Sequence, residues 1–284
     1  MMDYSKINLS GVFFISRAYS QKHAHMLHKH KGILELLYIA GGEGRYIVGN
    51  RGYAVKEGDL VICNAATIHG EAPFQEHTIE TYCIALANYD NGALPLGCLI
   101  DKARKPVISL ESFAAMAAQM MPSIYNLFTK DVQDKVICRQ LAISLLMIVE
   151  KLLQEHDSQN KFIIEQKNEN IVRELTEYLD ANYTENITLE KLSRVMHISV
   201  SHTSHLLKRE TGLSPMQYVI HRRIGEAQSL LAETQLPIKQ IEEQLGFGSS
   251  CHLSAMFKKY VGLSPRAYRK YFTDEADEKE KQLL

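Results

Sequence analysis

The chain of 284 residues contains no apolar run that approaches the roughly eighteen residues of a membrane-spanning helix. Its first six residues lack a hydrophobic signal segment, which argues against export. Its five cysteines form no Cys-x-x-Cys pair, which argues against zinc fingers and disulfide staples and suits a reducing cytoplasm. A net charge of −1 argues against a histone-like binder. We therefore expect a cytoplasmic protein of two domains without a membrane partner.

The C-terminal third contains an internal repeat. When residues 200–218 are moved by fifty positions onto 250–268, eight of the nineteen positions are identical, against about one expected by chance. The identical pairs are His202/His252, Ser204/Ser254, Lys208/Lys258, Gly212/Gly262, Leu213/Leu263, Ser214/Ser264, Pro215/Pro265 and Tyr218/Tyr268. Farther upstream the offset is forty-nine, so the second copy has one extra residue in its turn.

Each copy predicts two helices joined by a tight turn. Apolar residues at helical spacing indicate a first helix over Leu189–Met196 in one copy and Ile238–Leu245 in the other. Both second helices stop at Gly-Leu-Ser-Pro, residues 212–215 and 262–265. Glycine past a helix end adopts the left-handed conformation, serine caps the next helix, and proline suits its first turn. The expected structure is a helix-turn-helix, whose second helix fits the major groove of DNA.

The second helices divide into an apolar face and a polar face. Leu206, Leu207, Leu253 and Phe257 predict the buried face. The candidates for base contacts are the polar side chains near the front of each helix: Ser201, His202, Ser204, His205, Ser250, Cys251, His252 and Ser254. The candidates for phosphate contacts are the cations behind them: Lys208, Arg209, Lys258 and Lys259. One amphipathic helix is more often simple core, but two matched units favour binding of double-stranded DNA.

These motifs resemble the AraC/XylS family of bacterial transcription activators over about the last hundred residues. The pattern runs from Gly246 to Arg269, and residues 218–231 resemble the connector that holds two reading heads about one DNA turn apart. The resemblance implies RNA polymerase as a partner and base contacts at Ser201, Ser204, His205, Ser250, Cys251, His252 and Ala255. Ala255 departs from the arginine often found there, so the second head would read DNA shape or thymine methyl groups.

The first ninety residues show short strands between glycine turns, typical of a sandwich or barrel. The expected strands are Val12–Ile15, Leu34–Ala40, Arg45–Val48, Tyr53–Lys56, Leu60–Cys63 and Thr81–Leu86. Residues 28–35 and 58–69 resemble the two motifs of the cupin barrel. The expected fold class is therefore α+β multidomain, with a cupin-like β-barrel and following helices, then an all-α domain of two helix-turn-helix units joined by a linker helix.

The candidates for a ligand pocket are His28, His30, Glu35 and His69. In metal-binding cupins the matching positions hold iron, manganese or a similar ion, and three imidazoles with a carboxylate suit such an ion. In regulators of the resembled family the same positions commonly line a sensor cavity without metal. We expect a pocket for a small-molecule effector such as a sugar, and no cofactor. The alternatives are a divalent metal at these four residues or a purely structural cluster.

From Leu110 onward the pattern is helical. We expect helices over residues 113–128 and Val132–Leu153, and the resemblance implies that the second one joins two copies in a homodimer. The expected boundaries are 1–155 for a sensor and dimerisation domain, 156–170 for a linker, 171–272 for the DNA-binding domain and 273–284 for an acidic tail. The DNA-binding domain is only mildly basic, with thirteen Lys and Arg against ten Asp and Glu.

Together these patterns favour a ligand-responsive, sequence-specific transcription activator without enzymatic activity. One rival is a cupin metalloenzyme, such as an oxygenase or isomerase, with an appended DNA-binding module. A second rival is a DNA-repair alkyltransferase, which needs a cysteine-rich metal site that this chain lacks.

Overall fold

The computed structural model describes residues 3–18, 26–72, 79–130, 135–157, 166–248 and 250–270, with the backbone alone at 166–169 and 250–251. Its strands are β1 (Asn8–Ile15), β2 (Ile33–Val48), β3 (Arg51–Lys56), β4 (Asp59–Cys63), β5 (His69–Glu71), β6 (Ile79–Ala87) and β7 (Val107–Ser109). Its helices are η1 (Tyr4–Lys6), η2 (Glu111–Phe113), α2 (Ala114–Lys130), α3 (Lys135–Asp157), α4 (Gln166–Asn182), α5 (Leu189–Met196), α6 (Val200–Thr211), α7 (Pro215–Glu233), α8 (Ile238–Gln244) and α9 (Ser250–Val261).

The N-terminal half is an antiparallel sheet in the order β1-β6-β2-β4-β7, with β3 and β5 paired to the far end of β2. We predicted two strands separated near Gly42, and this was wrong because β2 is one strand of sixteen residues. The register shifts between Ile39 and Gly41, and Gly42 has φ of 82°. Glycine tolerates that conformation, so β2 bends here. The residues before the bend pair with β4 and β6, and those after it pair with β3 and β5.

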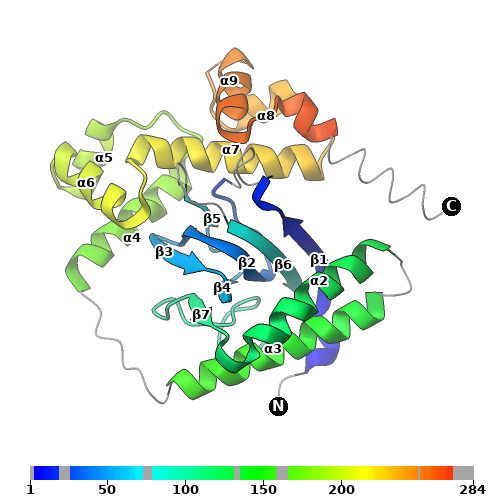
Figure 1. Ribbon diagram of the computed structural model, residues 1–284. Coiled ribbons are helices and arrows are strands. Elements are labelled where there is room, and N and C mark those ends of the chain that lie inside the picture. The colour runs from blue at the N-terminus through cyan, green and yellow to red at the C-terminus, as the bar shows by residue number, and fades with distance from the viewer. Residues whose placement is uncertain are drawn as a thin grey trace.

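Two helices cover one face of this sheet. Figure 1 shows α2 and α3 on one side of the strands and the long helix α7 on the other. Leu34, Leu36 and Ile84 of the sheet share a core with Ile124 of α2 and Leu145 of α3. Among the described strands β1 and β7 end the ladder, so the cupin-like sheet is open rather than a closed barrel. A sheet-rich domain followed by helices is thus confirmed.

The C-terminal half is helical, and its predicted start and stop signals are confirmed. Thr188 accepts a hydrogen bond from the Lys191 amide at 3.2 Å, so α5 begins where the sequence indicated. Gly212 and Gly262 both have φ of 80° and end α6 and α9. Ser214 and Gln217 form a capping box at the start of α7. Each copy of the repeat therefore is a helix-turn-helix.

The predicted linker, 156–170, overlaps helix at both ends. Residues 156–157 belong to α3 and 166–170 to α4, so α4 begins five residues before the expected start at Ile171. The intervening residues lie outside the described parts, as do 271–284, which include the predicted acidic tail. No helix within the described ranges is long and apolar enough to cross a membrane.

Candidate nucleic-acid interface and ligand pocket

The first reading head consists of α5 and α6, and it presents the predicted polar face to solvent. Leu206 and Leu207 are 1% and 0% exposed and bind α6 to its core. Three predicted base-contact residues, Ser201, His202 and His205, are exposed, and Ser204 is half-buried. The predicted phosphate contacts Lys208 and Arg209 are exposed in the last turn of the same helix. The arrangement leaves the front of α6 open to a DNA groove.

The second reading head consists of α8 and α9. Leu253 and Phe257 are buried, whereas Ala255, Lys258 and Lys259 are exposed. The predicted base contacts His252 and Ser254 are half-buried, and the His252 ring lies edge-on to Phe247 at 5.5 Å between centroids. This contact holds His252 partly against the turn. The side chains of Ser250 and Cys251, also predicted base contacts, lie outside the described residues.

Arg223 of α7 connects the two heads, a role that sequence reasoning missed. Its guanidinium donates to the Tyr183 carbonyl at 2.6 Å and the Glu185 carbonyl at 2.7 Å, both just before the first head. It also donates at 2.8 Å to the carbonyl of Gly246 in the turn of the second head. Three such bonds from one planar group fix the position of one head relative to the other.

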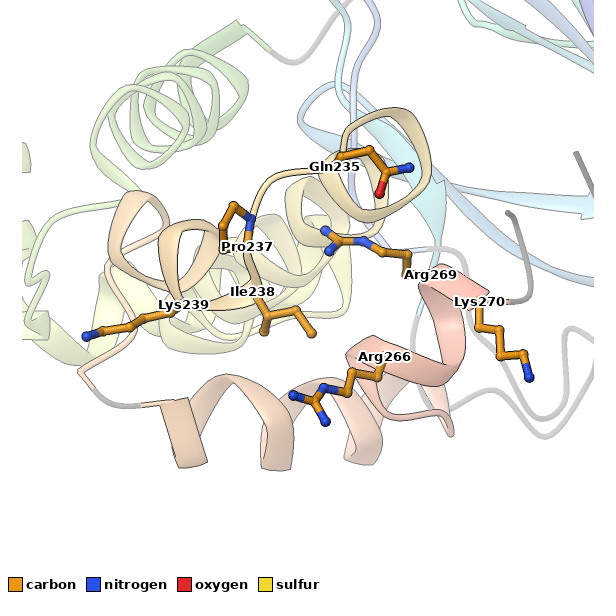
Figure 2. Close-up of a pocket in the computed structure, with 7 residues that line it drawn as sticks. All are labelled: Gln235, Pro237, Ile238, Lys239, Arg266, Arg269 and Lys270. Carbon is orange, nitrogen blue, oxygen red and sulfur yellow. The ribbon is translucent and has the colours of Figure 1, made fainter. Parts of the chain in front are cut away.

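A basic hollow of about 530 Å³ lies beside the second head (Figure 2). Its lining residues are Gln235, Pro237, Ile238, Lys239, Arg266, Arg269 and Lys270. Arg269 donates to the Leu236 carbonyl at 2.6 Å, while Lys239 and Arg266 are exposed. The four cations, Lys239 at the start of α8 and Arg266, Arg269 and Lys270 after α9, suit phosphate contacts, because the first helix of a helix-turn-helix crosses the DNA backbone. Sequence reasoning missed this set because Lys239 lies about thirty residues before the other three cations.

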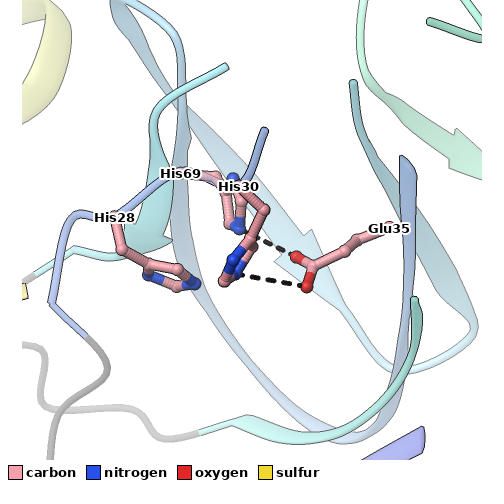
Figure 3. Close-up of side chains that lie close together, drawn as sticks. All are labelled: His28, His30, Glu35 and His69. Atoms are coloured by element: carbon pink, nitrogen blue, oxygen red, sulfur yellow. Dashed lines mark ion pairs between the residues drawn. The ribbon is translucent and has the colours of Figure 1, made fainter. Parts of the chain in front are cut away.

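The four predicted pocket residues lie together in the N-terminal domain (Figure 3). His69 Nε2 lies 2.8 Å from one carboxylate oxygen of Glu35, and His30 Nε2 lies 3.5 Å from the other. The ring of His28 lies 4.4 Å from that of His69, between centroids. Glu35 and His69 are 7% and 2% exposed, whereas His28 and His30 are half-buried. Two of the four side chains are therefore buried and two are partly accessible to solvent.

Glu35 is ionised in this cluster. Burial alone raises the pKa of its carboxyl, but the contact with His69 and the charges of His30 and His28 outweigh burial and lower the pKa to about 2. A buried, ionised carboxylate accepts hydrogen bonds and attracts cations. The site therefore suits either a ligand rich in hydroxyl donors or a positive ion.

The orientation of two imidazoles also bears on a metal ion. The Nδ1 atoms of His28 and His69 lie 2.8 Å and 2.9 Å from the carbonyls of Met26 and Thr67. A carbonyl only accepts, so each Nδ1 carries a proton and each Nε2 is the atom that would bind an ion. In His69 the ion would replace the proton that Nε2 shares with the Glu35 carboxylate, 2.8 Å away. The four candidate ligand atoms lie within 4.8 Å of one another. Bonds of about 2.1 Å to one ion allow separations up to about 4.2 Å, so the residues fit after a small contraction.

Comparisons with known proteins agree with this architecture. A sheet-rich domain followed by helices, joined to two DNA-reading heads on one helix, defines a DNA-binding transcription regulator. The AraC-like ligand binding domain matches residues 10–127, and a helix-turn-helix domain matches residues 192–271. The chain belongs to the AraC family of transcriptional regulators.

Several individual proteins are similar to this chain. The uncharacterized HTH-type transcriptional regulator YdiP of Escherichia coli is 27% identical over 252 residues, which is 86% of this chain and 81% of YdiP. The lactose operon transcription activator of Staphylococcus xylosus is 31% identical over 36% of this chain and 37% of that protein. The C-terminal domain of AraT from Geobacillus stearothermophilus is 31% identical, with a TM-score of 0.36, over 37% of this chain and 88% of that domain.

Proposed function

We propose that this regulator works in the cytoplasm as an activator and responds to a small polyhydroxylated molecule, such as a sugar, held by His28, His30, Glu35 and His69. The observation that carries the proposal is the buried, ionised Glu35 surrounded by three imidazoles in the domain that matches a ligand-binding family. Hydroxyl groups donate to the carboxylate and accept from imidazole N–H groups. We assign regulation rather than catalysis, because relatives matching most of the chain are regulators.

Ligand-induced stabilisation tests the effector proposal. A sugar that binds the folded protein alone raises the free energy of unfolding by about 2.7 kcal/mol at one hundred times its Kd. Thermal unfolding of the full chain across a panel of monosaccharides should identify such a ligand, and Glu35→Gln should abolish the shift. His202→Ala, an exposed histidine on α6, is the matched control. Equal shifts for Glu35→Gln and the unchanged chain would exclude the pocket.

A divalent metal is the second candidate for this pocket, favoured by the two Nδ1 atoms bonded to carbonyls. His28, His30, Glu35 and His69 would then hold the ion, which would supply positive charge for an anionic or hydroxylated effector. Titration with Co²⁺ followed by visible absorption tests this reading. Stoichiometric binding that is lost in the His28→Ala, His69→Ala double variant supports the metal. A folded chain that shows no Co²⁺ spectrum refutes it.

The helix α3 is the proposed surface for homodimerisation. Val136, Ile137 and Met147 are 68%, 52% and 49% exposed, which is unusual for large apolar residues on one helix. A second copy packed there would remove them from water. Sedimentation should give a dimer, and Val136→Asp with Ile137→Asp should give a monomer. A dimer that persists in this variant would exclude α3.

RNA polymerase is the proposed partner in activation, tested by transcription in vitro.

A further inference from the structure

Residues 26–30, here called the strap, belong to the ligand pocket and to the DNA-binding domain at once. His28 and His30 are two of the four pocket residues. The backbone of His28 exchanges two hydrogen bonds with that of His69, at 3.0 Å and 2.9 Å. One residue earlier, Leu27 is fully buried in the core of the first reading head, and Met26 is buried in the core of the second. Five consecutive residues thus join the pocket to both heads.

The strap lies directly on α7, the helix that carries both heads. The carbonyl of Leu27 accepts a hydrogen bond from Arg222 Nη1 at 2.7 Å, and the amide of Met26 donates to Gln228 Oε1 at 3.2 Å. Between them Gly225 has no side chain, and a Cβ there would lie 2.1 Å from the Leu27 carbonyl oxygen. The backbones of Leu27 and Gly225 are therefore in direct contact, so any shift of the strap toward α7 is blocked and any other shift breaks this contact.

Charged groups hold the strap on the same helix. Arg222 is 0% exposed, and its Nε atom bonds Asp180 at 2.9 Å while its guanidinium lies 4.8 Å from the centre of the Tyr183 ring. Lys29 of the strap forms an ion pair with the same Asp180. A buried guanidinium that loses a hydrogen-bond partner raises the free energy of the folded state. The bond from Arg222 therefore opposes movement of the Leu27 carbonyl away from α7. These contacts tie the position of the strap to that of α7.

The strap leaves the DNA-reading faces uncovered. Ser201, His202 and His205 of the first head and Lys258 and Lys259 of the second are exposed while the strap is in place. Simple occlusion of DNA by the N-terminal domain is therefore not how these contacts act. The contacts instead determine how each head packs on α7.

We propose that the occupant of the pocket controls DNA binding by changing the position of the strap on α7, an inference that rests on the proposed effector function. Consecutive Cα atoms are about 3.8 Å apart and cannot separate, so a ligand that moves His28 also moves Leu27. With the strap in place, Met26 and Leu27 complete both cores and the heads bind DNA. When the strap moves away, the heads lose these contacts and their fixed spacing.

The test is a double-mutant cycle on the full chain, with a fluorescent duplex selected from random DNA. His69→Ala disturbs the pocket, and Gly225→Ala separates the strap from α7 while favouring the helix itself. We expect His69→Ala to change the Kd for DNA by at least about fivefold in the unchanged chain and by less than about twofold in Gly225→Ala. Gly225→Ala alone should weaken binding by about tenfold or more.

Two further variants keep this test decisive. Gln228→Ala removes the acceptor for the Met26 amide and should reduce the effect of His69→Ala even where Gly225→Ala unfolds the domain. Glu233→Ala, exposed at the end of α7, is the control and should leave that effect unchanged. An effect of His69→Ala that is equal in all backgrounds, or absent from the unchanged chain, overturns the proposal. Failure of the unchanged chain to bind any duplex would instead refute DNA binding itself.

Discussion

The salt dependence of DNA binding follows from four cations behind the reading faces. We consider replacement of Lys208, Arg209, Lys258 and Lys259 by alanine. Each phosphate contact contributes about −0.9 to the slope of log K against log salt concentration, so four contacts contribute at most about −3.6. Arg209 already pairs with Glu210 at 2.8 Å, which reduces its share. We therefore expect the slope to become less steep by about 3.

Fluorescence anisotropy with a selected duplex between about 50 and 200 mM KCl measures this slope. When the salt concentration doubles, a slope difference of about 3 means that the unchanged chain loses roughly eight times more affinity for DNA than the fourfold variant does. The matched control replaces four exposed lysines of the N-terminal domain, Lys6, Lys56, Lys102 and Lys105, and should keep the original slope. Equal slopes for the control and the fourfold variant would refute the assignment of these cations to phosphates.

Three further outcomes are expected. Burial lowers the pKa of His221 to about 4, so the folded protein loses stability as pH falls from about 6.5 toward 4. At pH 5 the loss from this group is about 2 kcal/mol, and urea unfolding should show that His221→Leu removes it. Gly246→Ala should destabilise by about 2 kcal/mol or more in the same assay, because its φ is 69° and its Cβ would lie 1.9 Å from the Thr184 carbonyl oxygen. Lys239→Ala with Arg266→Ala in the basic hollow should reduce the salt slope by up to about 2, and an unchanged slope would exclude phosphate there.

Local signals made the helical half predictable. Thr188 and the repeated Gly-Leu-Ser-Pro act on neighbouring residues, so α5 matches its predicted bounds and α6 ends at Gly212 as expected. The sheet was less predictable. A pair of glycines allows either a turn or a bend, and only the pairing of β2 with β3 and β6 decides between them. The strands β5 and β7 have three residues each, too few to show alternation.

The candidate ligand site could be predicted from the sequence, whereas the contacts between the domains could not. The cupin-like spacing identified His28, His30, Glu35 and His69, which the fold brings together. The bond from Arg222 to the Leu27 carbonyl joins residues 195 positions apart, and nothing in either local sequence indicates it. A buried arginine in an otherwise ordinary helix is visible as unusual only after folding. Contacts between domains therefore required the structure.

The central claim is that two heads on α7 read one side of the double helix at a fixed distance. The most direct measurement is the affinity of the full chain for duplexes in which two selected half-sites are separated by about 5 to 15 base pairs. We expect the affinity to be highest when the half-site centres are about 10 to 10.5 base pairs apart, and to fall at least about tenfold at spacings half a turn away. Affinity that does not depend on the spacing would contradict it.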